Sequence, residues 1–217
     1  MYALVTRNTW HEENVYYMLM VRSVKKIGDV INMALRKIRI DEDPVLRKKA
    51  KEIKHIDDDI KKLIEDMAET MYDAPGVGLA APQVGVSKRL VMVDVGDGQG
   101  LQVFINPKII KKEGELEDGI EGCLSVPGIW GDVKRQLKKI TVKAINRKGK
   151  GITIDASGFR ARAIQHELDH LDGILFTDKA THLRSKEDME EEIAEQHKDN
   201  NISSLIEEIK EKRLTLS

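Results

Sequence analysis

The stretch Gln165-His-Glu-Leu-Asp-His170 is the most informative part of this chain for its fold. His166 and His170 are four residues apart, so on a helix both imidazoles lie on one face, one turn apart. Glu167 lies about 100° further round such a helix, where its carboxylate reaches a water on a metal that both rings hold. The spacing His-Glu-x-x-His is typical of metallohydrolases, which take two metal ligands and a general base from it. The stretch therefore predicts a helix with a metal site.

The flanking sequence predicts one helix of about three turns, from about Arg160 to Asp172. Ser157 is placed to cap its start, and Gly173 is placed to end it. Its apolar positions recur at i, i+4 and i+7 and are Ile164, Leu168 and Leu171. Ala163 falls with the two His and the Glu on the opposite side. A surface helix would carry mostly Lys, Arg and Glu there, so this face is typical of a wall that lines an interior cavity; a chance pattern on a surface helix is the alternative.

Composition and charge limit the classes of protein to which the chain can belong. Its 217 residues suffice for one well-buried domain with appendages. The net charge of −1 and an aromatic content of 4% argue against phosphate attraction and base stacking, so no direct nucleic-acid binding is expected. The single cysteine excludes an internal disulfide and suits a reducing cytoplasm. No run of about 18 apolar residues occurs, so no membrane-spanning segment is predicted.

Three segments of the chain differ in character. Residues 1–33 show no sustained periodicity and lead into Met33, itself a natural start, so we interpret them as an extension that packs poorly. Residues 34–178 are predicted to form a single catalytic domain. Residues 179–217 form an acidic tail, which from Arg184 onward holds ten acidic and six basic residues. We expect this tail to be helical, in two pieces with weak apolar stripes.

Periodicity predicts an α+β domain with an antiparallel sheet. A helix precedes the strands, because apolar residues recur about every 3.6 positions from Ile56 to Met71, with cap candidates at Asp57–Asp59. Ile38–Leu46 is expected to be extended, since Pro44 breaks a helix. The strands are expected at Arg89–Val95, Leu101–Ile105, Ile109–Glu117, Lys139–Ile145 and Gly151–Ala156. Short strands bracketed by helices favour antiparallel pairing.

A glycine- and alanine-rich loop lies between this helix and the first strand. Ala74–Gln83 reads Ala-Pro-Gly-Val-Gly-Leu-Ala-Ala-Pro-Gln, which leaves little side chain in the way of a ligand. Gly76 and Gly78 permit close approach of the backbone. The loop lacks the Lys-Ser/Thr of a phosphate-binding loop, so it is either a ligand-contacting segment or a tight turn.

A site with two histidines still needs a third protein ligand. A metzincin would place a third His at the position of Phe176, and Phe cannot bind a metal. A metallopeptidase of the His-Glu-x-x-His type would take a Glu from a following helix, and the available residues are Glu187, Glu190 and Glu191. Cys123 is the other candidate, because its thiolate is a strong ligand for zinc or ferrous iron. From the residues alone, both a metallopeptidase with a Glu ligand and an enzyme with Cys123 as ligand are possible.

Three segments resemble the motifs of peptide deformylases, in the order and at the separations found in that family. They are Gly76-Val-Gly-Leu-Ala-Ala-Pro-Gln83, Glu121-Gly-Cys-Leu-Ser125 and Gln165-His-Glu-Leu-Asp-His170. The resemblance covers roughly residues 36–176. It implies the deformylase fold: antiparallel sheets packed around a central metal-binding helix, with an N-terminal helix and, in this chain, a C-terminal helical extension.

The resemblance also implies an activity, the removal of the formyl group from the formyl-methionine of nascent polypeptides with release of formate. Cys123, His166 and His170 would hold a metal that activates water for the attack. Glu167 would take a proton from this water and deliver it to the departing amine. The family typically carries one Fe(II) ion and also accepts zinc, nickel or cobalt.

The same resemblance assigns the contacts to substrate. The Gln83 side-chain amide and the Leu124 backbone N–H would meet the oxyanion. The peptide would lie extended along Val77-Gly78 and around Glu121-Gly122, adding a strand.

The methionine side chain is expected in an apolar pocket lined partly by Phe159 and Ala163. Arg162 lies close in the sequence, and we expect its long side chain to turn away from the pocket. Glu121 and Arg135 are candidates for an ion pair that either shapes the loop or is a surface contact.

The implied substrates, N-formyl-methionyl nascent peptides, emerge from ribosomes. A transient ribosome contact and a cytoplasmic location are therefore expected. In some relatives a basic C-terminal helix is thought to dock there, and the acidic tail of this chain argues against that mode.

Overall fold

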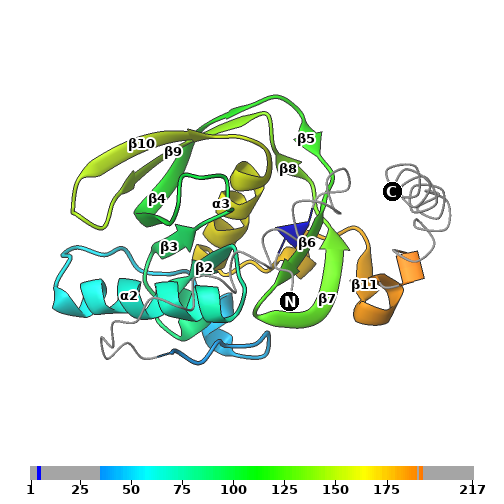
Figure 1. The fold of residues 1–217 in the computed structure, drawn as a ribbon, viewed down its shortest axis with the longest axis horizontal. Coiled ribbons are helices and arrows are strands. Elements are labelled where there is room, and N and C mark those ends of the chain that lie inside the picture. Colours follow the sequence, from blue (N-terminus) through cyan, green and yellow to red (C-terminus); the bar gives the residue numbers. More distant parts are fainter. Residues whose placement is uncertain (1–3, 6–34, 190, 193–217) are drawn as a thin grey trace, which may run out of the picture.

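Antiparallel sheets and two long helices make up the part of the chain that the computed structural model describes, residues 4–5, 35–189 and 191–192 (Figure 1). A five-stranded sheet has the order β10 (Gly151–Ala156), β9 (Lys139–Ile145), β4 (Gln102–Glu113), β3 (Leu90–Val93) and β2 (Gly78–Ala80). A four-stranded sheet has the order β1 (Leu4–Val5), β6 (Ile120–Cys123), β7 (Val126–Asp132) and β11 (Leu183–Ser185). A third, two-stranded sheet pairs β5 (Leu116–Glu117) with β8 (Arg135–Gln136). The expected α+β class with antiparallel sheets is confirmed.

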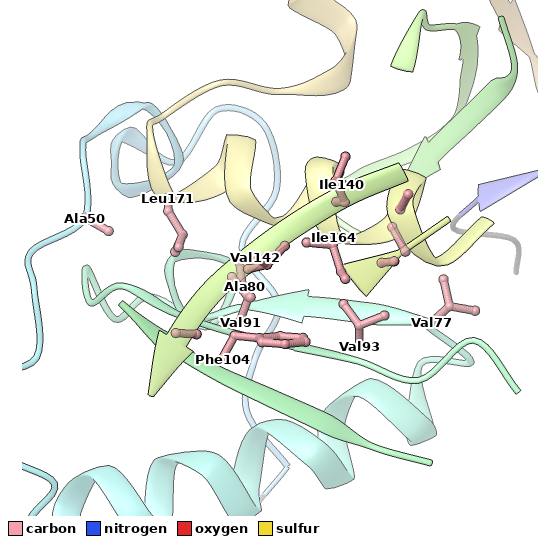
Figure 2. Packing of buried hydrophobic residues seen from close by; sticks show 14 residues of the cluster. Ala50, Val77, Ala80, Val91, Val93, Phe104, Ile140, Val142, Ile164 and Leu171 are labelled. Carbon is pink, nitrogen blue, oxygen red and sulfur yellow. The ribbon is translucent and has the colours of Figure 1, made fainter. Parts of the chain in front are cut away.

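The two helices that cover the opposite faces of the five-stranded sheet are α2 (Asp58–Asp73) and α3 (Gly158–Leu171). Successive residues of a strand point to opposite faces of a sheet. Strand β3 therefore gives Leu90 and Met92 to the apolar cluster under α2, and Val91 and Val93 to the cluster under α3. Figure 2 shows the second cluster, in which Ile164 of α3 packs against the sheet. With both faces covered, β3 is buried along its whole length.

Helix α3 lies inside the molecule. Its residues from Arg160 to Glu167 are all buried, as are His170 and Leu171, so the chance pattern on a surface helix is excluded. The helix begins two residues earlier than expected and ends one residue earlier. Ser157 occupies the N-cap position, but its side chain makes no capping hydrogen bond. Gly173 follows the helix with a φ of 75°, a conformation that favours glycine and stops the helix.

Helix α2 confirms the amphipathic helix before the strands. Asp57, one of the cap candidates, accepts a hydrogen bond of 2.9 Å from the N–H of Ile60. The expectation of an extended chain is wrong at the end of Ile38–Leu46, because Pro44–Arg47 forms a short 3-10 helix, η1. Pro in the first turn of a helix loses no hydrogen bond, and Asp43 caps this turn.

Strand β4 corrects a second expectation, since it runs through the break that was expected after Ile105. Asn106 has a φ of 51°, and the register against β9 shifts at this point. Pro107 has no N–H to give to the ladder, and such a residue is tolerated at a bulge. The strand therefore bends and continues, and only Leu116–Glu117 separates from it as β5. Strands β9 and β10 have the expected bounds.

Most of the extension expected over residues 1–33 and most of the helical tail expected over residues 179–217 lie outside the described residues. Of the extension, β1 is described, and it pairs antiparallel with β6, with Leu4 opposite Glu121 (blue in Figure 1). Of the tail, β11 pairs with β7, and residues 186–189 and 191–192 are helical. None of the helices in the described ranges has the length and apolar content that a bilayer crossing requires.

Candidate metal centre

Three buried side chains bring potential metal ligands together between β6 and α3. One ligand atom from each of Cys123, His166 and His170 lies within 4.8 Å of the others. The Sγ atom of Cys123 is 3.2 Å from Nε2 of His170, and the two imidazole centroids are 5.0 Å apart. Glu187 and Glu191, which a metallopeptidase could have used, do not belong to this group, and Glu190 lies outside the described residues. The geometry therefore favours the sulfur as third ligand.

The sulfur is held at the end of β6 by a local irregularity in the hairpin. The pairing of β6 with β7 shifts register between Gly122 and Cys123. Two donors then point at Sγ: the backbone N–H of Ser125 at 3.4 Å and Nε2 of Gln83 at 3.5 Å. N–H groups aimed at a sulfur stabilise negative charge on it, and a thiolate is the form that binds a metal.

Glu121 orients the first histidine. Its Oε2 atom lies 2.9 Å from Nδ1 of His166, so the Nε2 atom of that ring is left for a metal. The guanidinium of Arg135 holds both carboxylate oxygens, each at 2.7 Å. Burial alone would raise the pKa of Glu121, but the hydrogen bonds from Arg135 and His166 hold that pKa well below its usual range. The pair is buried, which excludes the surface contact that the sequence left open.

Arg162 corrects a sequence expectation, because its side chain does not turn away. It is fully buried and donates to Oε1 of Glu121 at 3.0 Å. It also donates to the backbone carbonyls of Val133 at 2.7 Å and Glu117 at 3.0 Å. The sequence carried a signal for this contact, since Arg162 and His166 are four apart on α3 and so meet the same carboxylate.

The network continues from Glu121 to the protein surface. The Nη1 atom of Arg135 donates to Asp169, the fifth residue of the histidine motif. Lys179 closes the chain, with Nζ at 2.7 Å from both oxygens of Asp169. The spacing of the motif predicted roles for His166, Glu167 and His170 as metal ligands and general base. It predicted no role for Asp169.

Glu167 lies in the same buried region without a counter-charge of its own. Its Oε2 atom has no hydrogen-bond partner within the described part of the chain. Burial, supported by the negative charge of Glu121, raises the pKa of Glu167 to about 7, against the opposing charges of His166 and Arg135. On its other side the carboxylate packs on Gly78, where a Cβ would lie 2.4 Å from Oε1. Glycine at this position thus leaves the room that the carboxylate occupies.

The second histidine fits a metal ligand on chemical grounds. Burial lowers the pKa of His170 well below its usual value, with the charge of His166 as the next cause, so its ring is neutral. A neutral imidazole is the form that coordinates a metal. Its Nδ1 atom is buried without a hydrogen-bond partner among the described residues, and its Nε2 atom faces the sulfur. Two imidazoles and one sulfur in contact form a donor set that suits zinc or ferrous iron.

Gln83 and Leu124 flank the sulfur. The Oε1 atom of Gln83 accepts from the N–H of Ala80 at 2.7 Å, which turns its NH2 group toward Cys123 and toward Oγ of Ser125, 3.3 Å away. The buried Ser125 is a neighbour that the sequence did not single out. Leu124 lies in the turn between β6 and β7, directly after the sulfur.

The residues expected to contact substrate lie in two groups. Val77 and Gly78 lead into β2, on one side of Glu167, and Gly122 lies in β6 beside Cys123. Phe159 and Ala163 lie on α3, in the apolar cluster between this helix and the five-stranded sheet. Ala163 is fully buried and Phe159 is partly buried there.

Comparison with known proteins identifies the family. The family model of polypeptide deformylases matches residues 35–186, which include all three motifs. The chain belongs to this family. It is therefore an enzyme of the deformylase family, a family of metalloenzymes that remove the N-formyl group from nascent peptides.

Curated peptide deformylases are similar to this chain over most of its length. The protein from Symbiobacterium thermophilum is 58% identical over 166 residues, which cover 75% of this chain and 76% of that protein. The protein from Acetivibrio thermocellus is 56% identical over 158 residues, which cover 73% of this chain and 91% of that protein.

Solved deformylase structures share the fold. The crystal structure of peptide deformylase from Thermotoga maritima is 46% identical and has a TM-score of 0.66, covering 69% of this chain and 99% of that one. The deformylase from Synechococcus elongatus in complex with actinonin is 39% identical with a TM-score of 0.65, covering 72% of this chain and 87% of that one. The resemblance drawn from the three motifs is thus confirmed.

Proposed function

We propose that the chain hydrolyses the formyl amide of N-formyl-methionyl nascent peptides with a divalent metal held by Cys123, His166 and His170. The observation that carries the proposal is the convergence of these three buried donors beside Glu167, a carboxylate with one oxygen that has no hydrogen-bond partner among the described residues. Hydrolysis adds water across the C–N bond, so formate and a free α-amine leave. The histidine-motif peptidase with a Glu ligand has no observation in its favour.

Fe(II) is the metal we propose, one ion per chain, with zinc, nickel or cobalt as substitutes. If Cys123 binds as a thiolate and both imidazoles bind in their neutral form, a divalent ion keeps a charge near +1, and this donor set accepts all four metals. When bound, such an ion acts as a Lewis acid that lowers the pKa of a water to about 7. A ferrous site with a thiolate ligand is expected to be oxygen-sensitive.

Glu167 is proposed to move the proton. Its pKa of about 7, raised chiefly by burial, is close to a neutral working pH, where a group can both accept and donate. The carboxylate would take a proton from the attacking water and give it to the nitrogen of the departing amine. Gly78 keeps the room for this carboxylate, because any side chain there would collide with it.

Gln83 and Leu124 are proposed to stabilise the oxyanion. The amide of Gln83 is already oriented, since its oxygen is fixed by the N–H of Ala80 and its nitrogen faces the sulfur. A donor that needs no reorientation contributes most in a water-excluded site, and losing one typically costs about 2.7–4 kcal/mol of transition-state stabilisation. The backbone N–H of Leu124 would be the second donor.

Strand β2 offers an edge for the peptide. It is the last strand of its sheet, and the N–H of Ala80 points away from β3 to Gln83. Backbone groups alternate along a strand, so the N–H and C=O of Gly78 face the same edge. An extended peptide there would add a strand, and its methionine would lie toward Phe159 and Ala163. A peptide that also paired with Glu121-Gly122 of β6 would take the place of β1.

The source of the substrate implies where in the cell the enzyme works and what it meets there. Nascent chains reach the enzyme at the ribosome, so we propose a transient ribosome contact and a cytoplasmic location. The acidic tail remains an argument against docking through a basic C-terminal helix.

An anaerobic assay with a formyl-methionyl peptide tests the proposal. Formate release should follow the metal content of the same sample, and Cys123→Ser should lower both. A matched control is a peptide that is acetylated instead of formylated, which should release no product. Activity that persists in metal-free protein, or a metal content that Cys123→Ser leaves unchanged, would refute the proposed ligand set.

A further inference from the structure

The outer edge of β6 is occupied by the chain's own N-terminal segment. In the four-stranded sheet β6 lies between β1 and β7. The pairing with β1 is antiparallel, with Leu4 opposite Glu121 and Val5 opposite Ile120 (Figure 1). Because β7 is joined to β6 by a short turn, a further strand can pair with β6 only in the place of β1.

This edge leads to the candidate metal centre. Strand β6 runs from Ile120 to Cys123, so its last residue carries the sulfur. The loop before β2 lies against the turn that follows β6, since a Cβ on Gly76 would lie 2.9 Å from Cδ1 of Leu124. The two segments that are proposed to pair with the peptide are thus neighbours, and a peptide that pairs with the second one runs along the outer edge of β6.

Strand β1 has the direction of a substrate. The formyl group that reacts is on the first residue of a substrate, so a bound peptide runs outward from the metal ligands. Because β6 runs toward Cys123, such a peptide is antiparallel to β6. Strand β1 is antiparallel as well, and its first residue, Leu4, pairs nearer to Cys123 than Val5 does. Its backbone therefore occupies the edge in the orientation that a bound peptide needs.

The pairing between β1 and β6 is short enough to be displaced. It extends over two register pairs, whereas β9 and β10 share six. Elements held by few backbone hydrogen bonds open at a low cost in free energy. A substrate adds the contacts of its formyl group and its methionine side chain to the same backbone pairing, so it can replace β1.

We propose that β1 is an autoinhibitory strand, which competes with the nascent peptide for the outer edge of β6. The proposal rests on the proposed function, since that function brings a peptide to this edge. The free enzyme then has a closed form, in which β1 pairs with β6, and an open form that binds the peptide. Only the open fraction is competent, so the apparent dissociation constant of a peptide is raised by the inverse of that fraction.

Binding of a peptide that is not hydrolysed tests the competition directly. The probe is a fluorescently labelled N-acetyl-methionyl peptide, whose anisotropy is followed with the full metal-loaded chain. In Leu4→Pro/Val5→Pro, β1 loses both N–H donors, so the hydrogen-bonded pair is broken whichever of the two pairs it is. This proline variant should bind the probe at least about threefold more tightly than the wild type.

A matched control exchanges the same two residues and keeps their N–H groups. The variant Leu4→Val/Val5→Leu has the composition of the wild type and should bind the probe as the wild type does. Amide hydrogen exchange in β6 should be faster in the proline variant alone, because release of β1 leaves this edge open to solvent. Exchange in β6 that is the same in all three proteins overturns the proposal, since β1 would then not protect this edge.

Hydrolysis of a formyl-methionyl peptide gives a second readout. The proline variant should have a KM at least about threefold lower than that of the wild type and the same kcat, because saturating substrate displaces β1 in both. Faster exchange in β6 together with unchanged, weaker or absent binding of the probe overturns the proposal, and β1 then only covers an exposed edge. If none of the three proteins hydrolyses the peptide but the proline variant binds the probe more tightly, the proposed function fails and the competition is supported.

Discussion

Glu121 and Glu167 are two buried carboxylates beside the same histidine pair, and their surroundings differ in kind. Glu121 is held by Arg135, Arg162 and His166, and its pKa is pushed below the usual range despite burial. Glu167 has one oxygen without a partner in the described structure, and burial raises its pKa to about 7. A carboxylate surrounded by donors stays ionised and fixes its neighbours. A carboxylate left without them exchanges a proton near neutral pH.

The contrast assigns different tasks to two residues of one type. Glu121 contacts His166, and we propose that it is a positioning residue that acts through this ring rather than on a reacting atom. Glu167 is proposed to touch the attacking water. Four predictions test whether this division holds.

Replacing the unpartnered carboxylate should have the strongest effect on catalysis. Glu167→Gln keeps the shape of the side chain and removes the basic oxygen. We expect kcat to fall by about 10²–10⁴-fold, the usual contribution of a general base. Metal content, measured on the same sample, should stay that of the wild type. A variant that loses its metal would show that Glu167 supports the ligands, and the contrast with Glu121 would then fail.

In metal-free protein, the opposite pKa shifts of Glu167 and Glu121 should appear in the way stability depends on pH. The folded pKa of Glu167, about 7, lies above its ordinary value of 4.5, so between these pH values only the folded state keeps the proton. This group therefore lowers stability as pH rises, by up to about 3 kcal/mol above pH 7. Glu121 has the opposite sign: its lowered pKa contributes stability above about pH 4.5 that is lost as the pH falls.

Urea unfolding at about pH 5 and about pH 8 measures this effect. The metal-free Glu167→Gln variant should be more stable than the wild type at the higher pH, by up to about 3 kcal/mol, with a smaller difference at the lower pH. Below about pH 4 both proteins should lose stability together, because both retain Glu121. A difference that does not change with pH would contradict the raised pKa of Glu167.

Removing the partnered carboxylate should weaken metal binding rather than the proton transfer. Glu121→Gln leaves His166 without its ionised acceptor, and the loss of such an outer partner typically costs about 10–100-fold in metal affinity. At saturating metal, the pH profile of kcat should stay that of the wild type. A shifted profile with normal affinity would mean that Glu121 takes part in the proton transfer.

The exposed end of the Glu121 network should matter least. Lys179 and Asp169 form an ion pair in which the lysine is 38% exposed, and pairs in contact with water contribute about 0–1 kcal/mol. Lys179→Ala should therefore change the free energy of unfolding by less than about 1 kcal/mol and leave metal affinity unaltered. A loss comparable to that of Glu121→Gln would show that the whole chain of charges acts as one unit.

Sequence periodicity predicted the elements whose residues alternate or recur cleanly. The bounds of β9 and β10 follow from strict alternation, and the presence of α2 follows from the apolar stripe between Ile56 and Met71 with a capping aspartate at its start. The hairpin of β6 and β7 escaped prediction because its glycines and Pro127 interrupt the alternation. Besides pairing with each other, β6 pairs with β1 and β7 with β11, and no local pattern records these pairings with distant segments.

The residues of the site likewise fall into those that the local sequence predicted and those that depend on tertiary contacts. Local spacing predicted His166, Glu167 and His170, and Cys123 was one of the candidates for a third ligand that the resemblance then favoured. The structure brings Cys123 and the two histidines together. Arg162 was expected to reach solvent, because long basic side chains usually do. It is buried because Glu121 and three backbone carbonyls, brought from other segments by folding, accept hydrogen bonds from its Nη1 and Nη2 groups. Such compensation depends on tertiary contacts and is invisible in one helix.

Cys123 belongs to the four-stranded sheet, whereas both histidines belong to the helix that packs on the five-stranded sheet. A cation shared by these side chains would be a reversible cross-link between the two layers, and its binding energy would become part of the stability of their contact. Chelation should accordingly speed amide hydrogen exchange in β6 and β7 first. The ladder between β3 and β4, which contains no ligand, should stay protected until global unfolding.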